Sequence, residues 1–179
     1  MEDLSLHILD IAENSVAAKA DKIEIRITED KKKDLMSVEV FDNGEGMDKA
    51  TLEKALDPFY TSKTVRRFGF GLSLLSEAAE AANGHLSVQS KKGEGTRIKA
   101  DFQHSHIDRQ PLGDIGQTII TLIVGNPEID FIFEHKKNGH NYCLDTRIIR
   151  VQLNEMPINS LAGIKKIREI LKKTQKPPA

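Results

Sequence analysis

The chain has 179 residues, of which 39% are hydrophobic and 30% charged, and its formal net charge is −1. This length suits a globular protein with one good core and a small second unit. The near-balance of charge argues against a nucleic acid or an acidic membrane as a partner. No apolar run is long enough to span a bilayer, and a single cysteine, Cys143, allows no internal disulfide, so we expect a cytoplasmic protein.

The first hundred residues predict alternating helices and hairpins. Residues 4–20 place Leu6, Leu9, Ala12 and Val16 at helical spacing. Residues 22–30 and 37–44 alternate apolar and polar side chains, as the two strands of an antiparallel hairpin do. The remaining elements follow in order: a glycine-rich loop at 42–47, a short helix at 48–55, a strong helix closed by Asn83-Gly84, and a hairpin around Gly93 and Gly95.

The sequence after His104 has a different composition and predicts a second unit. An apolar helix ends at Gly125, a hairpin turns at Asn138-Gly139, and residues 140–153 are predicted as its second strand. A last helix carries an apolar face of Leu161, Ile164, Ile167, Ile170 and Leu171. We therefore expect two domains, 1–104 and 105–179, with the second a small α-β-β-α appendage that packs on the first or on a partner protein.

Two polar side chains share one face of the first helix. Asp10 and Asn14 are four residues apart, so both point the same way. An amide oxygen is a suitable ligand for Mg²⁺, and a carboxylate one turn earlier could orient or deprotonate a water. A polar pair on a helix is more often a solvated surface, so this spacing alone is weak evidence.

Two glycine-rich segments have the features of a nucleotide pocket. Asp42 ends a strand and precedes Asn43-Gly44-Glu45-Gly46, where the missing Cβ atoms let backbone approach a flat ring and the carboxylate could accept from an exocyclic amine. Gly69 and Gly71 open a helix whose first amides suit a phosphate, and Lys63 could add a positive charge. Ordinary turns and helix packing explain each segment equally well when it is taken alone.

The order of these segments resembles the GHKL ATPases, which include gyrase B, MutL and the histidine kinases. Residues 9–20 are similar to the N box of that family, 42–47 and 69–75 to its two glycine boxes, 58–63 to its F box, and 93–102 to its closing strands. The resemblance covers roughly residues 4–103. It implies the Bergerat fold, a two-layer α/β sandwich of the α+β class with a mixed, mostly antiparallel sheet.

The resemblance also implies ATP and Mg²⁺ as cofactors and assigns site residues. Asn14 would hold Mg²⁺ and touch the phosphates, and Asp42 would bind the adenine amine with Thr96 beside it. Gly44 and Gly46 would shape the base pocket, with Met47 against the ring. The residues expected to close on the phosphates or line the site beside them are Lys63, Gly69, Gly71 and Leu72.

One residue departs from the family pattern. Catalytic members, including the anti-sigma serine kinases, carry Glu four residues before the N-box Asn, and here that residue is Asp10. Glu13 is a poorer base because neighbouring side chains on a helix diverge. Asp10 is therefore the candidate catalytic residue, and we expect slow or partner-dependent hydrolysis. Few residues precede the N box, so a phosphoacceptor hairpin, and with it a self-contained sensor kinase, is not expected.

Three functions remain open on the sequence alone. The first is a stand-alone ATP-binding regulator whose C-terminal segment binds a protein partner. The second is a protein kinase acting in trans, and the third is a non-catalytic nucleotide-sensing scaffold. A metal site is also conceivable, because the chain from residue 104 onward has several candidate ligands, but none has a tight ligand spacing and scattered histidines are favoured. These residues are His104, His106, His135, His140 and Cys143.

Overall fold

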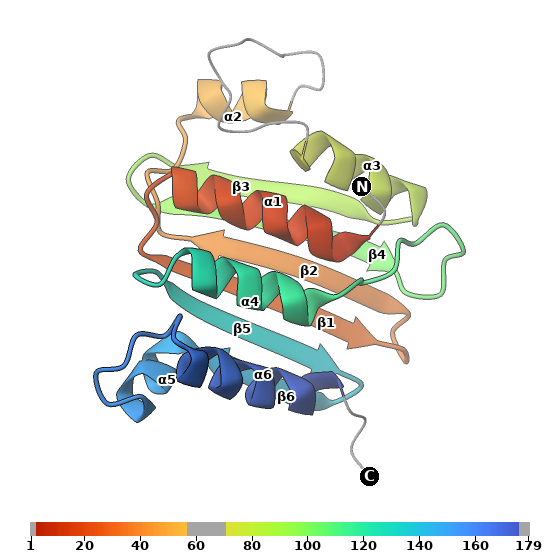
Figure 1. The fold of residues 1–179 in the computed structure, drawn as a ribbon. Coiled ribbons are helices and arrows are strands. Elements are labelled where there is room, and N and C mark those ends of the chain that lie inside the picture. The colour runs from red at the N-terminus through yellow and green to blue at the C-terminus, as the bar shows by residue number, and fades with distance from the viewer. Residues whose placement is uncertain (1–2, 57–70, 176–179) are drawn as a thin grey trace.

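The structure, a computed structural model, describes residues 3–56 and 71–175. In these residues the chain forms a six-stranded sheet with helices gathered on one side (Figure 1). In chain order the elements are α1 (Leu4–Ala17), β1 (Lys22–Asp30), β2 (Leu35–Asp42), α2 (Lys49–Leu56), α3 (Gly71–Ala81), β3 (His85–Lys91), β4 (Gly95–Gln103), α4 (Ile115–Gly125), β5 (Asp130–Lys137), β6 (His140–Asp145), α5 (Thr146–Gln152) and α6 (Leu161–Gln175).

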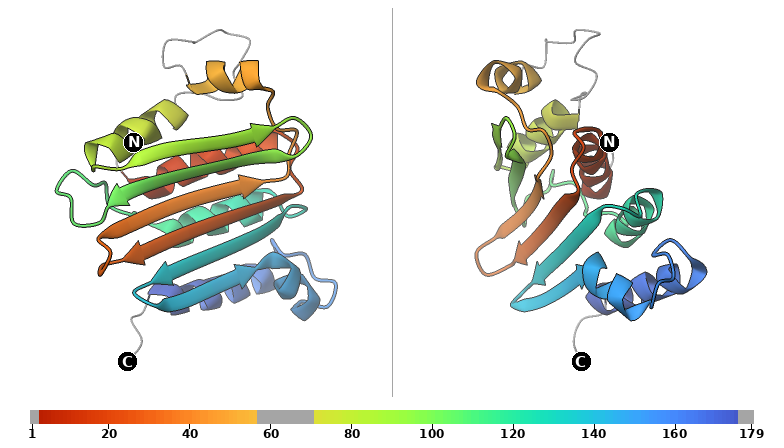
Figure 2. Two further views of the ribbon diagram at one scale, coloured as in Figure 1. Left: turned by 180° about the vertical axis from the view of Figure 1, so that it is seen from behind. Right: turned by 90° about the vertical axis from the view of Figure 1, so that its left-hand side faces the viewer.

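The strand order is β3-β4-β2-β1-β5-β6. All neighbours are antiparallel except β1 and β5, which pair in parallel from Lys22↔Asp130 to Glu29↔Lys137. A parallel pair needs a crossover, and the chain makes it through α4, which lies beside α1 on the same face of the sheet (Figure 2). The predicted α+β class with a mixed, mostly antiparallel sheet is confirmed.

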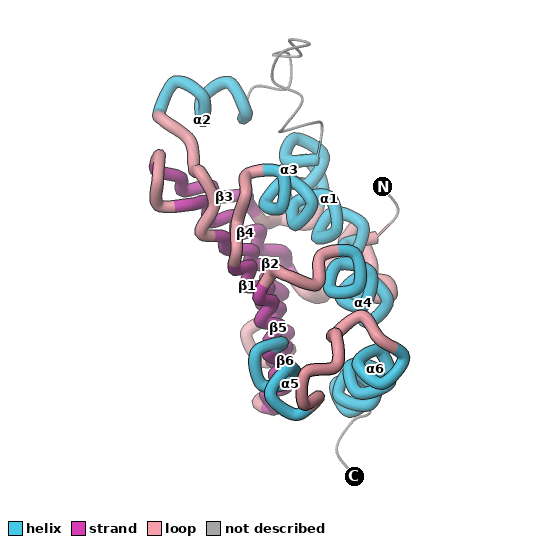
Figure 3. Tube along the Cα trace, turned by 60° about the vertical axis from the view of Figure 1, so that its left-hand side comes forward, coloured by secondary structure: helices cyan, strands magenta, loops and turns pink. Residues whose placement is uncertain are grey.

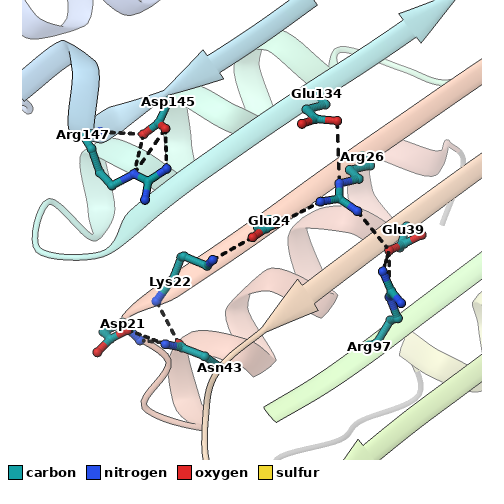
Figure 4. Close-up of polar contacts among 10 residues, drawn as sticks. All are labelled: Asp21, Lys22, Glu24, Arg26, Glu39, Asn43, Arg97, Glu134, Asp145 and Arg147. Atoms are coloured by element: carbon teal, nitrogen blue, oxygen red, sulfur yellow. Dashed lines mark hydrogen bonds and ion pairs between the residues drawn. The ribbon is translucent and has the colours of Figure 1, made fainter. Parts of the chain in front are cut away.

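Alternation along the strands explains why the molecule has two layers. In β1, Ile23, Ile25 and Ile27 are at most 1% exposed and face the helices, whereas Glu24 and Arg26 point to the opposite face. That open face carries a ladder of ion pairs: Arg26 lies 2.7 Å from Glu24, and Arg97 lies 2.8 Å from Glu39 (Figure 4). Figure 3 shows α1, α3, α4 and α6 together on the other side of the sheet. Charged side chains thus keep one sheet face in water.

The first helix is shorter than its sequence pattern suggests and buries a different face. It ends at Ala17, and Lys19 follows with a φ of 59°. Leu6, expected on the buried side, is 42% exposed. The buried positions instead include three polar residues, and the full set is Leu4, Ser5, His7, Ile8, Ile11, Ala12 and Ser15. The spacing of apolar residues therefore predicts the helix but not its orientation.

The predicted second strand of the C-terminal hairpin is only partly correct. Asn138 and Gly139 have φ values of 48° and 91°, as the turn requires, but β6 stops at Asp145 and the chain continues as α5. The Asp145 side chain accepts a hydrogen bond from the Arg147 amide, which caps the helix. Residues 146–153 mix apolar and polar side chains in a pattern that suits a strand as well as a helix, and this cap favours the helix. The C-terminal part is therefore α-β-β-α-α.

The N- and C-terminal parts of the chain share one core. Buried side chains of α1, β1 and α3 belong to the same cluster as Ile119 of α4, Phe131 and Phe133 of β5, and Ile167 of α6. Residues 105–175 thus extend both the sheet and the helical layer. Because α4 packs against α1, the C-terminal part contacts the helix that carries Asp10 and Asn14.

Candidate functional site

The base side of the site is built around Asp42, at the end of β2. Its side chain is 3% exposed, and both carboxylate oxygens accept hydrogen bonds. The Ser15 hydroxyl donates to one oxygen at 2.7 Å, and the Gly44 amide donates to the other at 2.9 Å. Thr96 is the cross-strand neighbour of Asp42 on β4 and shares its face. The carboxylate is thus held in one orientation before any ligand arrives.

The loop after Asp42 is held at Glu45, whose amide and carbonyl both make backbone hydrogen bonds to other segments. The Glu45 amide donates to the Ala18 carbonyl at 2.8 Å, and the Glu45 carbonyl accepts from the Gly93 amide at 2.7 Å. Gly46 has a φ of +62°, and a Cβ there would lie 2.0 Å from the Lys91 carbonyl oxygen. A side chain at this position would therefore push the loop away from the β3–β4 turn.

A second polar chain links Thr96 to Met47. The hydroxyls of Thr96 and Ser90 are 2.8 Å apart, and the Ser90 hydroxyl accepts from the Met47 amide at 2.8 Å. Met47 itself is 3% exposed. Ser90 therefore ties the strand that bears Thr96 to the end of the glycine loop.

Asp10 lies on α1 against the first residue of α3. A Cβ on Gly71 would lie 1.7 Å from Oδ2 of Asp10, so only glycine fits there. That oxygen is buried and has no hydrogen-bond partner among the described residues. Burial raises the pKa of the Asp10 carboxyl, and the nearby His7 opposes the rise. A half-buried carboxylate with a raised pKa and an unused oxygen suits proton transfer.

The structure brings most of the predicted site residues around α1. Asn14 lies one turn after Asp10 on the same helix, next to Ser15. Leu72 is 1% exposed and belongs to the hydrophobic core, where it anchors the start of α3. Lys63 and Gly69 lie outside the described residues.

The chain matches the family model of histidine kinase-, DNA gyrase B- and HSP90-like ATPases over residues 2–106. The chain belongs to this family. Residues 2–106 therefore form an ATP-binding domain of the GHKL type, as the order of the sequence boxes indicates.

Similar proteins include kinases and an anti-sigma factor. Sensor histidine kinase YxdK of Bacillus subtilis is 33% identical over 90 residues, which cover 48% of this chain and 27% of that protein. An anti-sigma F factor of Clostridium acetobutylicum is 36% identical over 64 residues, covering 35% of this chain and 41% of that one. The matched region spans less than half of either relative.

The Aquifex aeolicus MutL ATPase domain complexed with ADP has the same fold. It superposes on 97% of this chain and 70% of its own, with a TM-score of 0.51 and 17% sequence identity. The superposition includes the C-terminal part of the present chain. The GHKL fold is therefore shared across almost the whole molecule.

Two residues of this GHKL site are missing from the set that the sequence predicts. Ser15 holds Asp42, and Ser90 holds Thr96. Ser15 lies within the N-box segment and carries one usable signal, because it follows Ile11 by four residues on the buried face of α1, where a hydroxyl needs a partner. Ser90 is part of an alternating strand outside the boxes and carries none.

A hollow of about 490 Å³ opens on the charged face of the sheet and borders this site, because its lining includes Ser90 and Thr96. The lining also includes Phe41, Arg26 and Arg97. Phe41 precedes Asp42 on β2, so its side chain points to the opposite face. The charged groups around the hollow are paired with one another, as Figure 4 shows for Arg26, Glu39 and Arg97.

Several histidines from residue 104 onward are candidate metal ligands by type. In residues 3–56 and 71–175 no group of three or more His, Cys, Asp or Glu side chains could hold a metal ion. Two of these histidines instead meet at Glu29, whose Oε1 lies 2.8 Å from Nε2 of His135 and whose Oε2 lies 3.7 Å from Nε2 of His104. The hydrogen bond from His135 lowers the pKa of Glu29 to about 2.

Among the described helices none is long and apolar enough to cross a membrane.

Proposed function

We propose that this protein binds ATP with Mg²⁺ and acts as a regulator with slow or partner-dependent ATPase activity. The observation that carries the proposal is Asp42, a buried carboxylate fixed by Ser15 and Gly44 in a domain of this family. A carboxylate held in this way can accept from the exocyclic amine of adenine, and Thr96 lies beside it to bind the same edge of the base.

The phosphate side of the proposal rests on α1 and the start of α3. Asn14 would hold Mg²⁺ through its amide oxygen, together with phosphate oxygens and water. Gly71, Gly69 and Lys63 would lie against the phosphates, as the family boxes imply. Asp10 would accept the proton of the attacking water, a role that its buried, unpartnered oxygen supports.

Calorimetric titration with ATP, with and without Mg²⁺, tests the binding. Asp42→Asn should weaken ATP affinity at least about tenfold, because an amide replaces one acceptor with a donor that faces the adenine amine. Asp108→Asn, the same change on an exposed side chain, is the matched control and should bind as the unmodified protein does. Equal affinity of the Asp42→Asn variant would contradict the assignment.

A protein kinase acting in trans is the second candidate. The similarity to sensor kinases and to an anti-sigma factor favours it. γ-Labelled ATP incubated with the protein and candidate partner proteins separates the two functions, because only a kinase moves the label onto protein. If the protein binds ATP but neither hydrolyses it nor transfers its phosphate, the third function, a nucleotide-sensing scaffold, is the one that fits.

The C-terminal part supports regulation by a protein partner. Residues 105–175 share the sheet and core with the ATP-binding domain, and α4 packs against α1. A partner that contacts this part could therefore shift the helix that carries Asp10 and Asn14. Turnover measured with and without the partner would test this element of the proposal.

A further inference from the structure

A short strap between β4 and α4, residues 109–113, is tied to the start of α1. The carbonyls of Pro111 and Leu112 accept hydrogen bonds from the amides of Leu4 and Ser5, each at 2.9 Å. Gly113, with a φ of +75°, lies so close to Asp3 that a Cβ would meet its carboxylate at 2.4 Å. The strap thus satisfies amides that the first turn of a helix cannot pair internally.

The strap also holds one buried side chain of α1. Nε2 of His7 lies 3.0 Å from Oε1 of Gln110, and His7 is 1% exposed. Burial lowers the pKa of His7, so its neutral form is favoured. A neutral imidazole that donates through Nε2 leaves Nδ1 without a proton. That Nδ1 atom is buried and has no partner among the described residues.

The second unpartnered atom lies one turn further along α1. Asp10 follows His7 by three residues, which places the two side chains on neighbouring positions of the same helix surface. Its Oδ2 is buried and unpaired as well among the described residues, and His7 and Asp10 act on each other electrostatically. Nδ1 of His7 and Oδ2 of Asp10 do not hydrogen-bond to each other in this structure, and a proton shared between them would satisfy both atoms.

We propose that Gln110 and His7 are positioning residues for Asp10, through which the strap sets the ability of Asp10 to accept a proton. This inference rests on the proposed ATP hydrolysis. The attacking water would give its proton to Oδ2 of Asp10 as its oxygen bonds to the γ-phosphorus. The bond from that phosphorus to the β–γ bridging oxygen breaks, and its electron pair leaves with ADP. Oδ2 then passes the proton to Nδ1 of His7, while Nε2 keeps its proton on Gln110.

The charges that face His7 from the described part of the chain come from α1 and the residues before it. Asp3, Asp10 and the amino terminus act on His7 electrostatically. Helix α4 contributes no ionisable side chain, and the acids of the described part of α3, Glu77 and Glu80, are exposed. On β2 the inward-facing carboxylate is Asp42, which Ser15 and Gly44 already hold.

Nitrogen-15 NMR of the imidazole groups tests the link on the full chain without nucleotide. We expect the Nε2–H tautomer for His7, and a titration midpoint that falls by at least about half a pH unit in Asp10→Asn, because a neighbouring negative charge is lost. Gln110→Leu should lose the tautomer preference, and Gln110→Glu, which still accepts from Nε2, should restore it. An Nδ1–H tautomer in the unmodified protein, or an unchanged midpoint in Asp10→Asn, overturns the proposal.

The pH profile of ATP turnover provides the second readout. Gln110→Leu should lower kcat about tenfold and move the acidic limb of the kcat profile, with KM for ATP unchanged. Gln117→Leu, the same change on an exposed residue of α4, is the matched control and should alter neither. A Gln110→Leu profile that matches the control overturns the proposal. If ATP fails to bind or turn over, the proposed function is wrong, and the NMR result still decides the link.

Discussion

Asp42 lies against α1 and Asp10 lies on it, but the hydrogen bonding of their carboxylates differs. Asp42 is buried and both its oxygens accept hydrogen bonds, one of them from Ser15 of α1. Asp10, on α1 itself, is half-buried with a buried oxygen that has no partner among the described residues. A satisfied carboxylate is suited to recognition, because its geometry is already fixed. An unsatisfied one carries a cost in free energy that a proton, a water or a substrate can relieve.

The largest expected effect comes from filling the space beside Asp10. Gly71→Ala places a methyl group where Oδ2 of Asp10 lies, and should lower the free energy of unfolding by about 2–4 kcal/mol. Asp10→Ala in the same chain should recover most of this loss. Denaturant unfolding of the double-mutant cycle measures both. Gly125→Ala, with no neighbouring atom within 4 Å, is the control; a similar loss there would contradict the packing explanation.

Glu29 is a carboxylate with hydrogen-bond partners, and its contribution to stability can be measured as a function of pH. Its pKa is lowered from 4.5 to about 2, first by the hydrogen bond with His135. A lowered carboxyl pKa stabilises the fold above the unfolded value, so this contribution is present above about pH 4.5 and is lost as the pH falls toward 2. The loss should reach about 3 kcal/mol. Glu29→Gln should flatten this part of the stability profile, whereas the exposed Glu128→Gln should not.

Removing the Ser15 hydroxyl should leave Asp42, like Asp10, with a buried carboxylate oxygen that has no hydrogen-bond donor among the described residues. Ser15→Ala deletes the hydroxyl at 2.7 Å and leaves one oxygen of a buried carboxylate unpaired. We expect a loss of about 1–2 kcal/mol in unfolding free energy and about tenfold weaker ATP binding. Thermal unfolding and calorimetry measure the two effects. Ser76→Ala on α3, whose hydroxyl bonds the exposed Glu80, should change neither, and an equal effect there would remove the distinction.

The smallest predicted effect is a gain in folding stability when the charge of Asp10 is removed. Burial raises the pKa of Asp10, so its ionised form costs stability as the pH rises above the usual aspartate range. Asp10→Asn removes that charge and should stabilise the protein by up to about 1 kcal/mol at neutral pH while abolishing turnover. Thermal unfolding at about pH 4 and about pH 7 checks the sign, and the gain should be larger at the higher pH. A destabilised variant at neutral pH would show that Asp10 has partners after all.

Local sequence signals predict the parts of the site that depend on local geometry. The glycine-rich turn after Asp42 follows from turn chemistry over a few residues, whereas the place of Thr96 beside Asp42, through the pairing of β2 with β4, comes from the family resemblance. Prediction fails where the determinant lies far away in sequence. Which face of α1 is buried depends on α4 and the strap, roughly a hundred residues later in the chain, and their contacts bury His7 while leaving Leu6 exposed.

The C-terminal part shows the same limit. The helices and the Asn138-Gly139 turn are evident from spacing, but the parallel pairing of β5 with β1 is not, because nothing local specifies a crossover partner. Helix α5 escapes prediction for a different reason. A single aspartate, Asp145, ends the strand by capping a helix, and apolar residues on either side of it suit both structures.

The parallel pairing of β1 with β5 has a consequence for the modularity of the molecule. The family match ends at residue 106, so a cut near there would keep every recognised sequence box. It would also turn β1, an interior strand, into an open edge, uncover the side of α1 that α4 shields, and leave the first amides of α1 unpaired. The boundary that sequence similarity draws is therefore a poor place to divide the protein, because the strap, α4 and β5 complete the nucleotide-binding half.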